Sequence, residues 1–553
     1  MFLVLAIVMG CAPIAPILAQ HFTPPNGVLL TPASIITTGL QSSTRSCTGG
    51  FVSHTLDHIT TPSTTKVHQF ESNGTGVAIN DLNNDGWLDL VFANFKGPSS
   101  IFWNRGDFEF EKQELQESNA RAVNIVDVDG DGWQDIIFTH INVGPSYWHN
   151  TAFLDASGRS SFEHSYLPGV TNLSHSMAWG DLNHDNTLDL VTGSYDAELN
   201  QQPGGAFLFS GGAGVYYYQQ VSDKFTTKRL AKESQALAIA LFDVNMDGQT
   251  DILVGNDFDF PDQAWVSTAS GWQSASPFAR TSQHTMSYDW GDIDNNGNYE
   301  FFATDMNPYQ VDINGLAQWI PMMRKMPHRL SNTDVQRPQN VLQILSGNGK
   351  FQDEAGTRGV IASGWSWSGK FGDLNNDGYL DLYTVNGMID TELFNYLPSG
   401  ELVEANQAFV NQKDGTFAPA PEWKLDSQAS GRGMSIADLN NDGRLDIVVN
   451  NLHSPAILFE NQVCEGASFQ VDLNWPDSKN TRALGAQLLL HTSAGTMIRD
   501  VRSGSGYLSG DAARIHFGFP EDADLSMLEI RWPDGQVTRI DKLTANSLIT
   551  IER

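Results

Sequence analysis

Basic residues and long hydrophobic runs are scarce in this chain of 553 residues. Lys and Arg together number 32 against 64 Asp and Glu, so the formal net charge is −32. Because binding to nucleic-acid phosphates requires clustered positive charge, this shortage argues against a nucleic-acid partner. Beyond the N-terminus, no segment has 18 consecutive uncharged apolar residues, so we expect the rest of the chain to be soluble.

The aromatic content excludes a disordered acidic polymer. Apolar residues make up 40% of the chain, and there are 30 Phe, 14 Trp and 13 Tyr. Disordered acidic segments are poor in such side chains. Together with 50 Gly and only 17% charged residues, the composition indicates an all-β globular protein whose carboxylates are concentrated in particular places.

The N-terminal segment resembles an export signal. Residues 1–19 are almost wholly apolar and are followed by Gln20 and His21, which predicts a signal peptide over residues 1–20. Cleavage after Ala19 is one possibility. The other is a lipobox at residues 8–11, which would place a lipid on Cys11 and anchor the protein to a membrane. Either way we expect an exported protein, secreted or held at the outer cell surface.

One acidic motif, D-x-[ND]-x-D-G-x-x-D, occurs seven times with small variations. The fifth copy has Asn at position 5 and Glu at position 9, and the third has Asn186 in place of Gly. The residues at positions 1, 3, 5 and 9 are Asp81, Asn83, Asp85 and Asp89; Asp127, Asp129, Asp131 and Asp135; Asp181, Asn183, Asp185 and Asp189; Asp243, Asn245, Asp247 and Asp251; Asp292, Asp294, Asn296 and Glu300; Asp373, Asn375, Asp377 and Asp381; and Asp438, Asn440, Asp442 and Asp446.

This spacing predicts calcium loops. Oxygens at positions 1, 3, 5 and 9, with a backbone carbonyl at position 7, can converge on one point, and Gly at position 6 permits the sharp turn. Ca²⁺ accepts six to eight oxygens in irregular geometry, whereas Mg²⁺ requires a stricter octahedron. The alternative is plain turn chemistry, because Asp, Asn and Gly all favour turns. Seven copies, each with an acid at position 9, favour up to seven structural Ca²⁺ ions.

The flanks of the loops are short, apolar and β-branched, as in residues 77–79 and 447–449, which is typical of buried strands. They also exclude EF-hands, whose loops lie between helices. Hairpins with Gly-containing turns follow several loops. Strand, loop, strand and hairpin make a four-stranded unit, and radial repetition of such units predicts a seven-bladed β-propeller over residues 47–464.

These repeats resemble the FG-GAP/VCBS repeats found in integrin α-chain propellers. Several further segments resemble the cartilage-acidic-protein family, including its C-terminal ASPIC/UnbV domain; they are residues 385–388, 431–438, 480–486, 504–509, 515–518 and 531–535. The resemblance implies an extracellular protein that binds a protein or a glycan in cell adhesion. Residues 465–553 also contain two hairpin patterns, which predict a small β-sandwich packed on the propeller. Residues 21–46 are expected to be a linker.

Two cysteines flank an interrupted hairpin. In the interior repeats, a strand ending in Asn turns into a strand that begins with Phe. The last repeat has only the first half, which ends at Asn461, and the N-terminus has only the second half, which begins at Phe51. We therefore predict that residues 51–59 complete the seventh blade and that Cys47 and Cys464 form a disulfide beside it. The alternative is two free thiols.

Catalytic motifs are absent from the sequence. The Gly-rich run before Lys370 resembles a phosphate-binding loop by chance, and His54 and His58 offer either a zinc pair or two solvated histidines. The insertion at residues 307–340 is rich in Met and is either a partner-binding loop or a packed lid. We expect a binding protein and no enzyme; the rival interpretation is an enzyme that acts on extracellular polysaccharide and uses the propeller as a scaffold.

Overall fold

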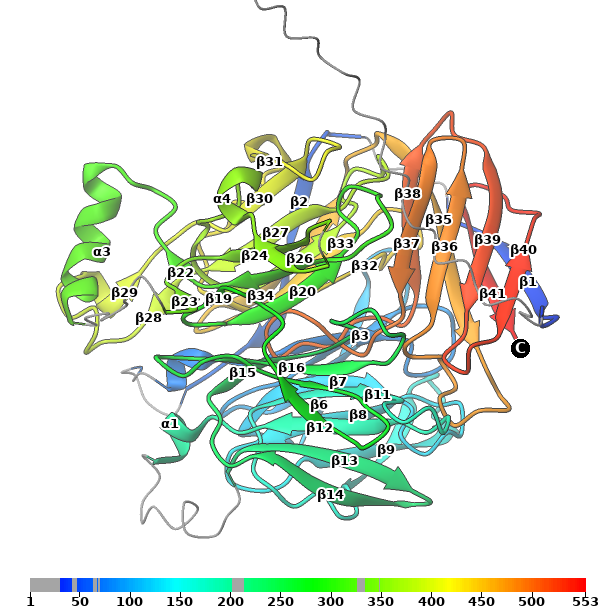
Figure 1. Ribbon diagram of the computed structural model, residues 1–553, viewed down its shortest axis with the longest axis horizontal. Helices are drawn as coiled ribbons and strands as arrows, with labels where there is room; N and C mark the ends of the chain where they lie inside the picture. The colour runs from blue at the N-terminus through cyan, green and yellow to red at the C-terminus, as the bar shows by residue number, and fades with distance from the viewer. Residues whose placement is uncertain are drawn as a thin grey trace, which may run out of the picture.

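The computed structural model describes residues 30–41, 47–62, 67, 70–200, 213–325, 334–347 and 349–553, and it is almost entirely β (Figure 1). The predicted signal peptide and the lipobox at Cys11 lie outside these residues. Within them, no helix is both long and apolar enough to cross a membrane.

Each repeated loop joins the first two strands of an antiparallel sheet, and the acid at position 9 is the first residue of the second strand. The first three sheets contain β3 (Val77–Asn80), β4 (Asp89–Phe92), β5 (Ser99–Asn104) and β6 (Phe110–Leu115); β7 (Ala120–Val126), β8 (Asp135–His140), β9 (Ser146–Leu154) and β10 (Ser160–Tyr166); and β11 (Ser176–Gly180), β12 (Asp189–Gly193), β13 (Val215–Val221) and β14 (Lys224–Ala231).

The same unit continues through the middle of the chain. The next three sheets contain β15 (Ala236–Phe242), β16 (Asp251–Asn256), β17 (Gln263–Val266) and β18 (Gln273–Ala275); β20 (Ser287–Gly291), β21 (Glu300–Thr304), β24 (Val341–Leu345) and β25 (Phe351–Asp353); and β26 (Gly364–Gly372), β27 (Asp381–Asn386), β30 (Gln407–Asn411) and β31 (Phe417–Pro419), with the short β22 (Met306–Asn307) beside β26. Two further short pairs are β19 (Thr281–Ser282) with β23 (Gln336–Arg337) and β28 (Met388–Ile389) with β29 (Glu401–Leu402).

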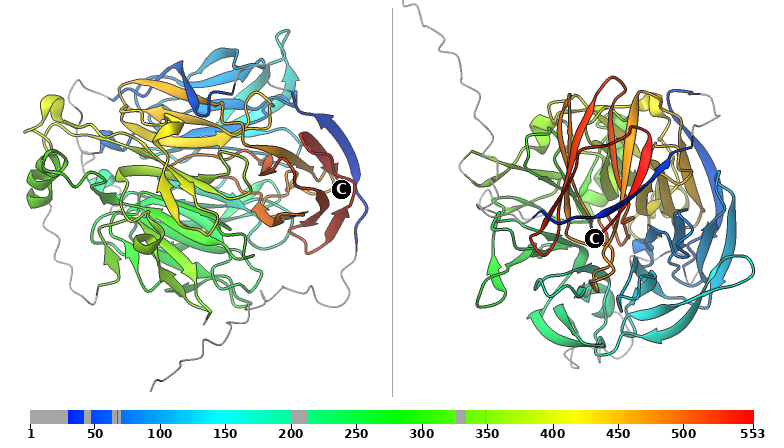
Figure 2. Two further views of the ribbon diagram at one scale, coloured as in Figure 1. Left: turned by 90° about the horizontal axis from the view of Figure 1, so that it is seen from above. Right: turned by 90° about the vertical axis from the view of Figure 1, so that its right-hand side faces the viewer.

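The seventh of these sheets is closed by the N-terminal segment, as predicted. It contains β32 (Gly431–Ala437), β33 (Asp446–Asn451), β34 (Pro455–Asn461) and β2 (Phe51–Ile59), and β2 pairs antiparallel with β34 so that Phe51 faces Asn461. The innermost strands contact one another in the cyclic order β3, β7, β11, β15, β20, β26 and β32, and β32 contacts β3. Figure 2 shows the sheets arranged around one axis in its right-hand view.

The predicted disulfide between Cys47 and Cys464 is present, and their Cα atoms are 5.7 Å apart. It joins residues separated by 417 positions, so it constrains a very long loop of the unfolded chain. We expect the double variant Cys47→Ser/Cys464→Ser to lose about 2–5 kcal/mol of unfolding free energy, measured by urea denaturation. Thr48→Ser, beside Cys47, is the control, because it changes an exposed side chain and leaves the disulfide intact. An unchanged midpoint in the double variant would show that strand pairing alone holds the ring closed.

The C-terminal domain is a sandwich of two four-stranded sheets. One contains β37 (Gly495–Asp500), β36 (Gln487–Thr492), β39 (Leu525–Arg531) and β40 (Val537–Ile540). The other contains β1 (Ser34–Gly39), β41 (Ser547–Glu552), β35 (Gly466–Asn474) and β38 (Ile515–Pro520). The expectation that residues 21–46 form only a linker is therefore wrong, because β1 pairs along its whole length with β41. An edge strand with open hydrogen-bonding groups recruits such a segment.

The segment 502–511, between β37 and β38, extends from this domain into the middle of the ring. Gly510 bridges to Ala78 of β3, and Gly506 bridges to Tyr288 of β20. The Val123 amide of β7 donates to the carbonyl of Leu508, and the Tyr507 amide donates to the Ser368 hydroxyl of β26. We call residues 502–511 the plug. Lys370, whose neighbours resemble a phosphate-binding loop, forms an ion pair with Asp511 of the plug.

Helices are few and short in the described residues. They are α1 (Asp196–Asn200), α3 (Ile313–Lys325) and α4 (Ala355–Arg358), with 3₁₀ turns η1 (Glu71–Asn73), η2 (Pro398–Gly400) and η3 (Pro421–Trp423). The Met-rich insertion forms α3, in which Trp319 and Met322 are buried while Ile313 is 88% exposed. Trp319 packs against Trp365 at the edge of the ring, so part of the insertion is a packed element.

Candidate metal centres in the repeated loops

Two left-handed positions shape each loop. Position 6 has positive φ in every copy, at 88° for Gly86 and 65° for Asn186, as the sequence predicts. Position 4 also has positive φ, which the motif did not reveal, and four of its seven residues are Asn. Asn adopts this conformation more readily than most residues, and this preference was the available signal. Met246 occupies the position in the fourth loop at φ 59°.

The carboxylate at position 1 organises the turn in the same way in each copy. One oxygen accepts from the amide at position 5, and the other accepts from the amide at position 6. In the first loop Asp85 N lies 3.2 Å from Asp81 Oδ1, and Gly86 N lies 2.8 Å from Asp81 Oδ2. The position-1 residues bonded in this pattern are Asp81, Asp127, Asp181, Asp243, Asp292, Asp373 and Asp438.

The acid at position 9 is buried and connects the loop to the third strand of its sheet. Asp89 Oδ2 accepts from the Leu82 amide at 3.1 Å, and Asp89 Oδ1 accepts from the Asn104 amide at 2.8 Å. In the second, third, fourth, sixth and seventh loops the corresponding donor is the amide of Asn150, Gln220, Ser267, Asn411 and Asn461, respectively. Each carboxylate oxygen has two lone pairs, so in Asp89 these two bonds leave one lone pair per oxygen for a cation.

Five loops have Asn at position 3. In four of them its Nδ2 donates to the carboxylate at position 5, at 2.9 Å in Asn83–Asp85 and 2.8 Å in Asn440–Asp442. In the same four the Asn Oδ1 accepts from the amide at position 5. Side-chain oxygens at positions 1, 3 and 5 are therefore held around one turn, as a calcium site requires.

Burial raises the pKa of many of these carboxyl groups. Burial above all, together with the charges of neighbouring acids in the same loops, raises the pKa of Asp81 to about 6 and those of Asp127 and Asp373 to about 7. It raises the pKa of Asp446 well above its usual value. Buried carboxylates that face one another bind protons unless a cation neutralises them. The loops therefore have the electrostatics of cation sites.

The second and fifth loops bring acidic oxygens together most closely. The groups Asp127, Asp129 and Asp131, and Asp292, Asp294 and Glu300, each have ligand atoms within 4.8 Å of one another. The fifth loop was the weakest match in sequence, yet Glu300, the first residue of β21, lies with Asp292 and Asp294 in one such group. Its oxygen accepts from the Ile293 amide at 3.0 Å.

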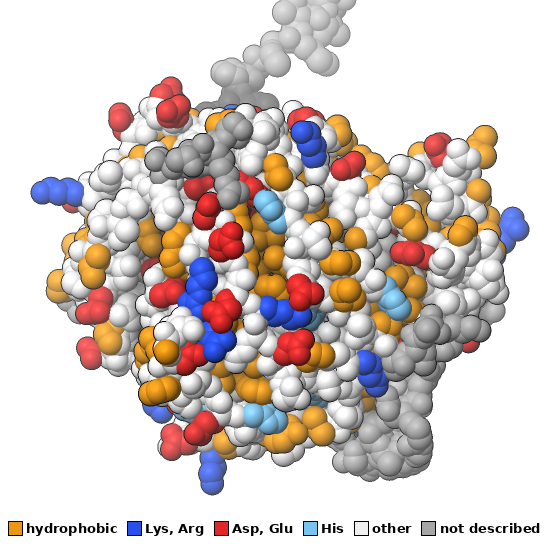
Figure 3. All heavy atoms as spheres, turned by 180° about the vertical axis from the view of Figure 1, so that it is seen from behind, with side chains coloured by type: hydrophobic (Ala, Val, Ile, Leu, Met, Phe, Trp, Pro, Cys, Tyr) orange, Lys and Arg blue, Asp and Glu red, His pale blue; other side chains and the backbone are white. Residues whose placement is uncertain are grey.

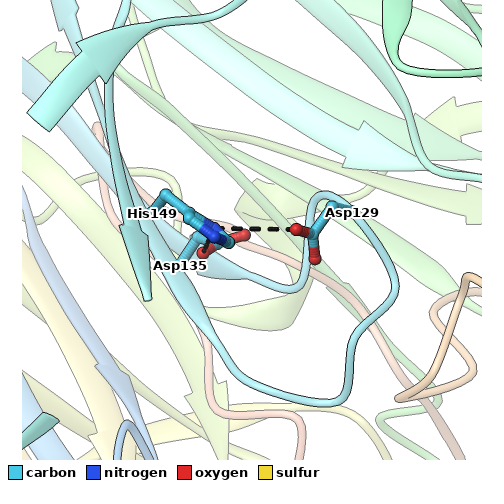
Figure 4. A group of neighbouring side chains, drawn as sticks. All are labelled: Asp129, Asp135 and His149. Carbon is cyan, nitrogen blue, oxygen red and sulfur yellow. Dashed lines mark hydrogen bonds and ion pairs between the residues drawn. The ribbon is translucent and has the colours of Figure 1, made fainter. Parts of the chain in front are cut away.

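His149, on β9, is a residue that the motif did not reveal. Figure 4 shows it pointing between Asp129 and Asp135 of the second loop. Its Nδ1 lies 3.3 Å from Asp135 Oδ1 and 3.6 Å from Asp129 Oδ2. The hydrogen bond to Asp135 raises the pKa of His149 to about 9, against the effect of partial burial. His149 directly precedes Asn150, whose amide donates to Asp135. This position in the sequence is the only signal by which His149 could have been found.

His54 and His58 do not form a metal pair. His54 Nε2 lies 2.7 Å from Glu460 Oε2, whereas His58 Nδ1 lies 3.1 Å from the Ser100 hydroxyl. His58 is buried and stacks on Phe92 at 4.8 Å, and burial lowers its pKa to about 3. The expectation of a solvated histidine is therefore wrong for His58, because the strand turns it onto the neighbouring sheet.

The C-terminal domain lies directly on the loop face of the ring. Thr481 donates its hydroxyl to Asp127 of the second loop, and Gln470 Nε2 donates to Asp438 of the seventh. Arg514 donates to Asn441 at 2.8 Å. Further bonds from the domain reach Asn84 of the first loop and Asn186 of the third. The conformation of these loops is therefore coupled to the docking of the C-terminal domain.

The surface mixes both signs of charge despite the net charge of −32. On the face shown in Figure 3, acidic and basic side chains lie among polar and hydrophobic ones. Much of the acidity is in the loops, where Asp89, Asp292 and Asp381 are completely buried. Formal charge therefore overstates how acidic the exposed surface is.

Comparison with family models identifies both parts of the chain. Residues 81–138, 127–192 and 397–449 match the FG-GAP-like repeat, and residues 476–553 match "ASPIC and UnbV". The FG-GAP repeats imply a β-propeller, so the expected all-β propeller class is confirmed.

Among curated proteins the chain is similar to cartilage acidic protein 1. It is 27% identical to the Xenopus tropicalis protein over 194 residues, which is 34% of this chain and 27% of that one. It is 30% identical to the Homo sapiens protein over 123 residues, which is 21% of this chain and 18% of that one. The matched regions thus span about a quarter or less of these relatives.

Among solved structures, two crystal structures of BBS1N in complex with ARL6DN are similar to this chain over much of its length. One crystal was soaked with mercury and the other with lead. They cover 72% and 70% of this chain and 97% and 91% of their own, at 9% and 8% identity. Their TM-scores are 0.39 and 0.37, and we base no argument on them.

Proposed function

From a chain that carries FG-GAP-like repeats and ends in an ASPIC/UnbV domain, we propose an extracellular, calcium-loaded binding protein. We count each of the seven ring sheets as one blade. The observation that carries the proposal is the recurrence of one loop geometry at the same place in all seven sheets. A scaffold stabilised in this way presents its remaining surface rigidly to a partner.

In this proposal the calcium ions are structural. Each loop connects two strands and several also hold the C-terminal domain, so an ion in a loop neutralises buried acids and fixes both contacts. Residues 1–20 would direct export, and a lipid on Cys11 would anchor the protein to a membrane. The partner class is an extracellular protein or glycan, as the distant likeness to cartilage acidic protein 1 supports.

A glycan array and a panel of immobilised extracellular-matrix proteins, probed with the full secreted chain in calcium, test this function. We expect saturable binding to one class that is lost in EDTA and restored by calcium. Heat-unfolded protein is the control for non-specific adhesion. Binding that is equal for folded and unfolded protein would contradict a binding scaffold.

A second candidate, a polysaccharide-acting enzyme, is favoured by one observation. Carboxylates and histidines outside the loops gather inside the ring, where Arg121 pairs with Glu198 at 2.6 Å and His175 Nδ1 lies 3.6 Å from Glu198. These side chains are fully buried, which suits a structural role better than attack on a polymer. A polysaccharide-hydrolysis screen comparing the chain with Glu198→Gln separates the two functions, since only an enzyme releases reducing ends in a Glu198-dependent way.

A further inference from the structure

The inside of the ring has a second polar region, at the end opposite the repeated loops. The loops follow the last residues of the innermost strands, whereas Arg432 and Arg121 lie near the first residues of β32 and β7. Trp367 lies near the beginning of β26. Because every innermost strand ends at a loop, these residues mark the other end of the ring, and the plug reaches it with Tyr507.

Arg432 is a buried cation without a counter-ion. Its side chain is 1% exposed. Its Nε donates to the Ser72 carbonyl at 2.5 Å, and its Nη1 donates to the carbonyls of Gly387 and Gly431 at 3.1 and 2.7 Å. Among the residues that the structure describes, its Nη2 has no hydrogen-bond partner. Burial lowers the pKa of Arg432 to about 9, as expected for a guanidinium removed from water without a partner.

Tyr507 of the plug places a second unpaired donor beside Arg432. Its ring lies 5.1 Å from that of Trp367, and the Arg432 guanidinium lies 4.3 Å from the same Trp367 ring. Tyr507 is completely buried, and its hydroxyl has no hydrogen-bond partner in the described part of the chain. Burial raises the pKa of Tyr507 well above its usual value, and the charge of Arg432 is the largest opposing influence. Both side chains with an unpaired donor therefore pack against the same Trp367 ring.

The other charged residues that act on Tyr507 are Glu198, Arg121 and Asp257, and each of them has a partner of opposite charge. Glu198 pairs with Arg121 at 2.6 Å, and Asp257 Oδ1 lies 2.6 Å from His284 Nδ1. Arg432 forms no ion pair within the described residues, and Glu401 is the acid whose charge acts on it. The undescribed residues contain neither Asp nor Glu, so they cannot supply the counter-ion. Arg432 therefore has no acid in direct contact among the described residues, and the charge of Glu401 acts on it without an ion pair.

We propose that Arg432 and Tyr507 bind a small monovalent anion inside the ring. The anion accepts from Arg432 Nη2 and from the Tyr507 hydroxyl, which satisfies both donors and neutralises the guanidinium. One donor comes from the ring and the other from the plug, so the anion joins the two domains at the end of the ring that the loops do not reach. A halide and a simple carboxylate share the required chemistry.

Bromide and acetate distinguish a halide site from a carboxylate site. Crystals of the full secreted chain, grown without halide and with calcium supplied as the sulfate, are soaked in sodium bromide. We expect an anomalous peak at hydrogen-bonding distance from Arg432 Nη2 and Tyr507 Oη. A peak that survives equimolar acetate identifies a halide site, and a peak that acetate displaces identifies a carboxylate site. A soak without an anomalous peak there overturns the proposal.

A solution measurement uses conservative variants. In a sulfate background at constant ionic strength, we expect sodium bromide or sodium acetate to raise the unfolding midpoint of the wild type in a saturable manner. Tyr507→Phe keeps the packing but removes one donor, so its half-saturating concentration should rise about tenfold. Tyr383→Phe is the matched control, because its buried hydroxyl donates to the Leu425 carbonyl. Equal anion responses in all three proteins would also overturn the proposal.

Discussion

Removal of divalent cations by EDTA is expected to lower the unfolding midpoint by more than about 10 °C. At free calcium 100-fold above its dissociation constant, one site stabilises the folded state by about 2.7 kcal/mol, and the proposed function has up to seven such sites. Once the ions leave, the buried acids at positions 1 and 9 repel one another or bind protons, as their raised pKa values show. Thermal unfolding monitored by tryptophan fluorescence measures the change.

Two variants show whether the sixth and fourth loops contribute differently to the stability of the protein. Asp373→Asn in the sixth loop removes a fully buried carboxylate that the C-terminal domain approaches at Gly518. Asp243→Asn changes the same position in the fourth loop. Each variant should release one calcium ion by elemental analysis, but Asp373→Asn should lower the midpoint more because it also disturbs docking. A midpoint unaffected by EDTA, or purified protein without bound metal, would contradict structural calcium.

Arg502→Met is expected to destabilise the protein by about 3–5 kcal/mol, because it leaves a buried acid without its cation. Arg502 Nη2 lies 3.0 Å from Asp289 Oδ1 in β20, and its Nε lies 3.3 Å from Asp511 Oδ2. Asp289 is completely buried. The guanidinium also lies 4.5 Å from the Trp290 ring. Arg502 is the first residue of the plug, and its side chain thus attaches the plug to the inner wall of the ring.

Arg531→Met is the matched control for this variant. Arg531 belongs to the same domain and pairs with Glu529 at 2.9 Å, but it is partly exposed and Arg539 pairs with the same carboxylate. Its loss should cost no more than about 1 kcal/mol. The shift of the urea midpoint compares the two. Equal shifts would mean that the plug contributes little to the joining of the domains.

Local chemistry made the repeated units predictable. Asp, Asn and Gly at fixed spacing define the loops through bonds between neighbouring residues, such as Gly86 N to Asp81 Oδ2, and the apolar flanks define the strands. The closure by residues 51–59 and the Cys47–Cys464 disulfide followed because the missing half of one hairpin could be found at the other end of the chain. Calcium binding itself stays a prediction.

The sequence by itself therefore determined the loops, the strands around them and the closure of the ring, because these depend on short-range patterns and one pairing rule. Only the tertiary structure decided that β1 joins the C-terminal sheet, that residues 502–511 fill the ring, and that His149 faces the second loop. It also decided that Arg432 is left without a counter-ion. Each of these arises from contacts between residues far apart in the chain, whose side chains carry no periodic signal until the backbone brings them together.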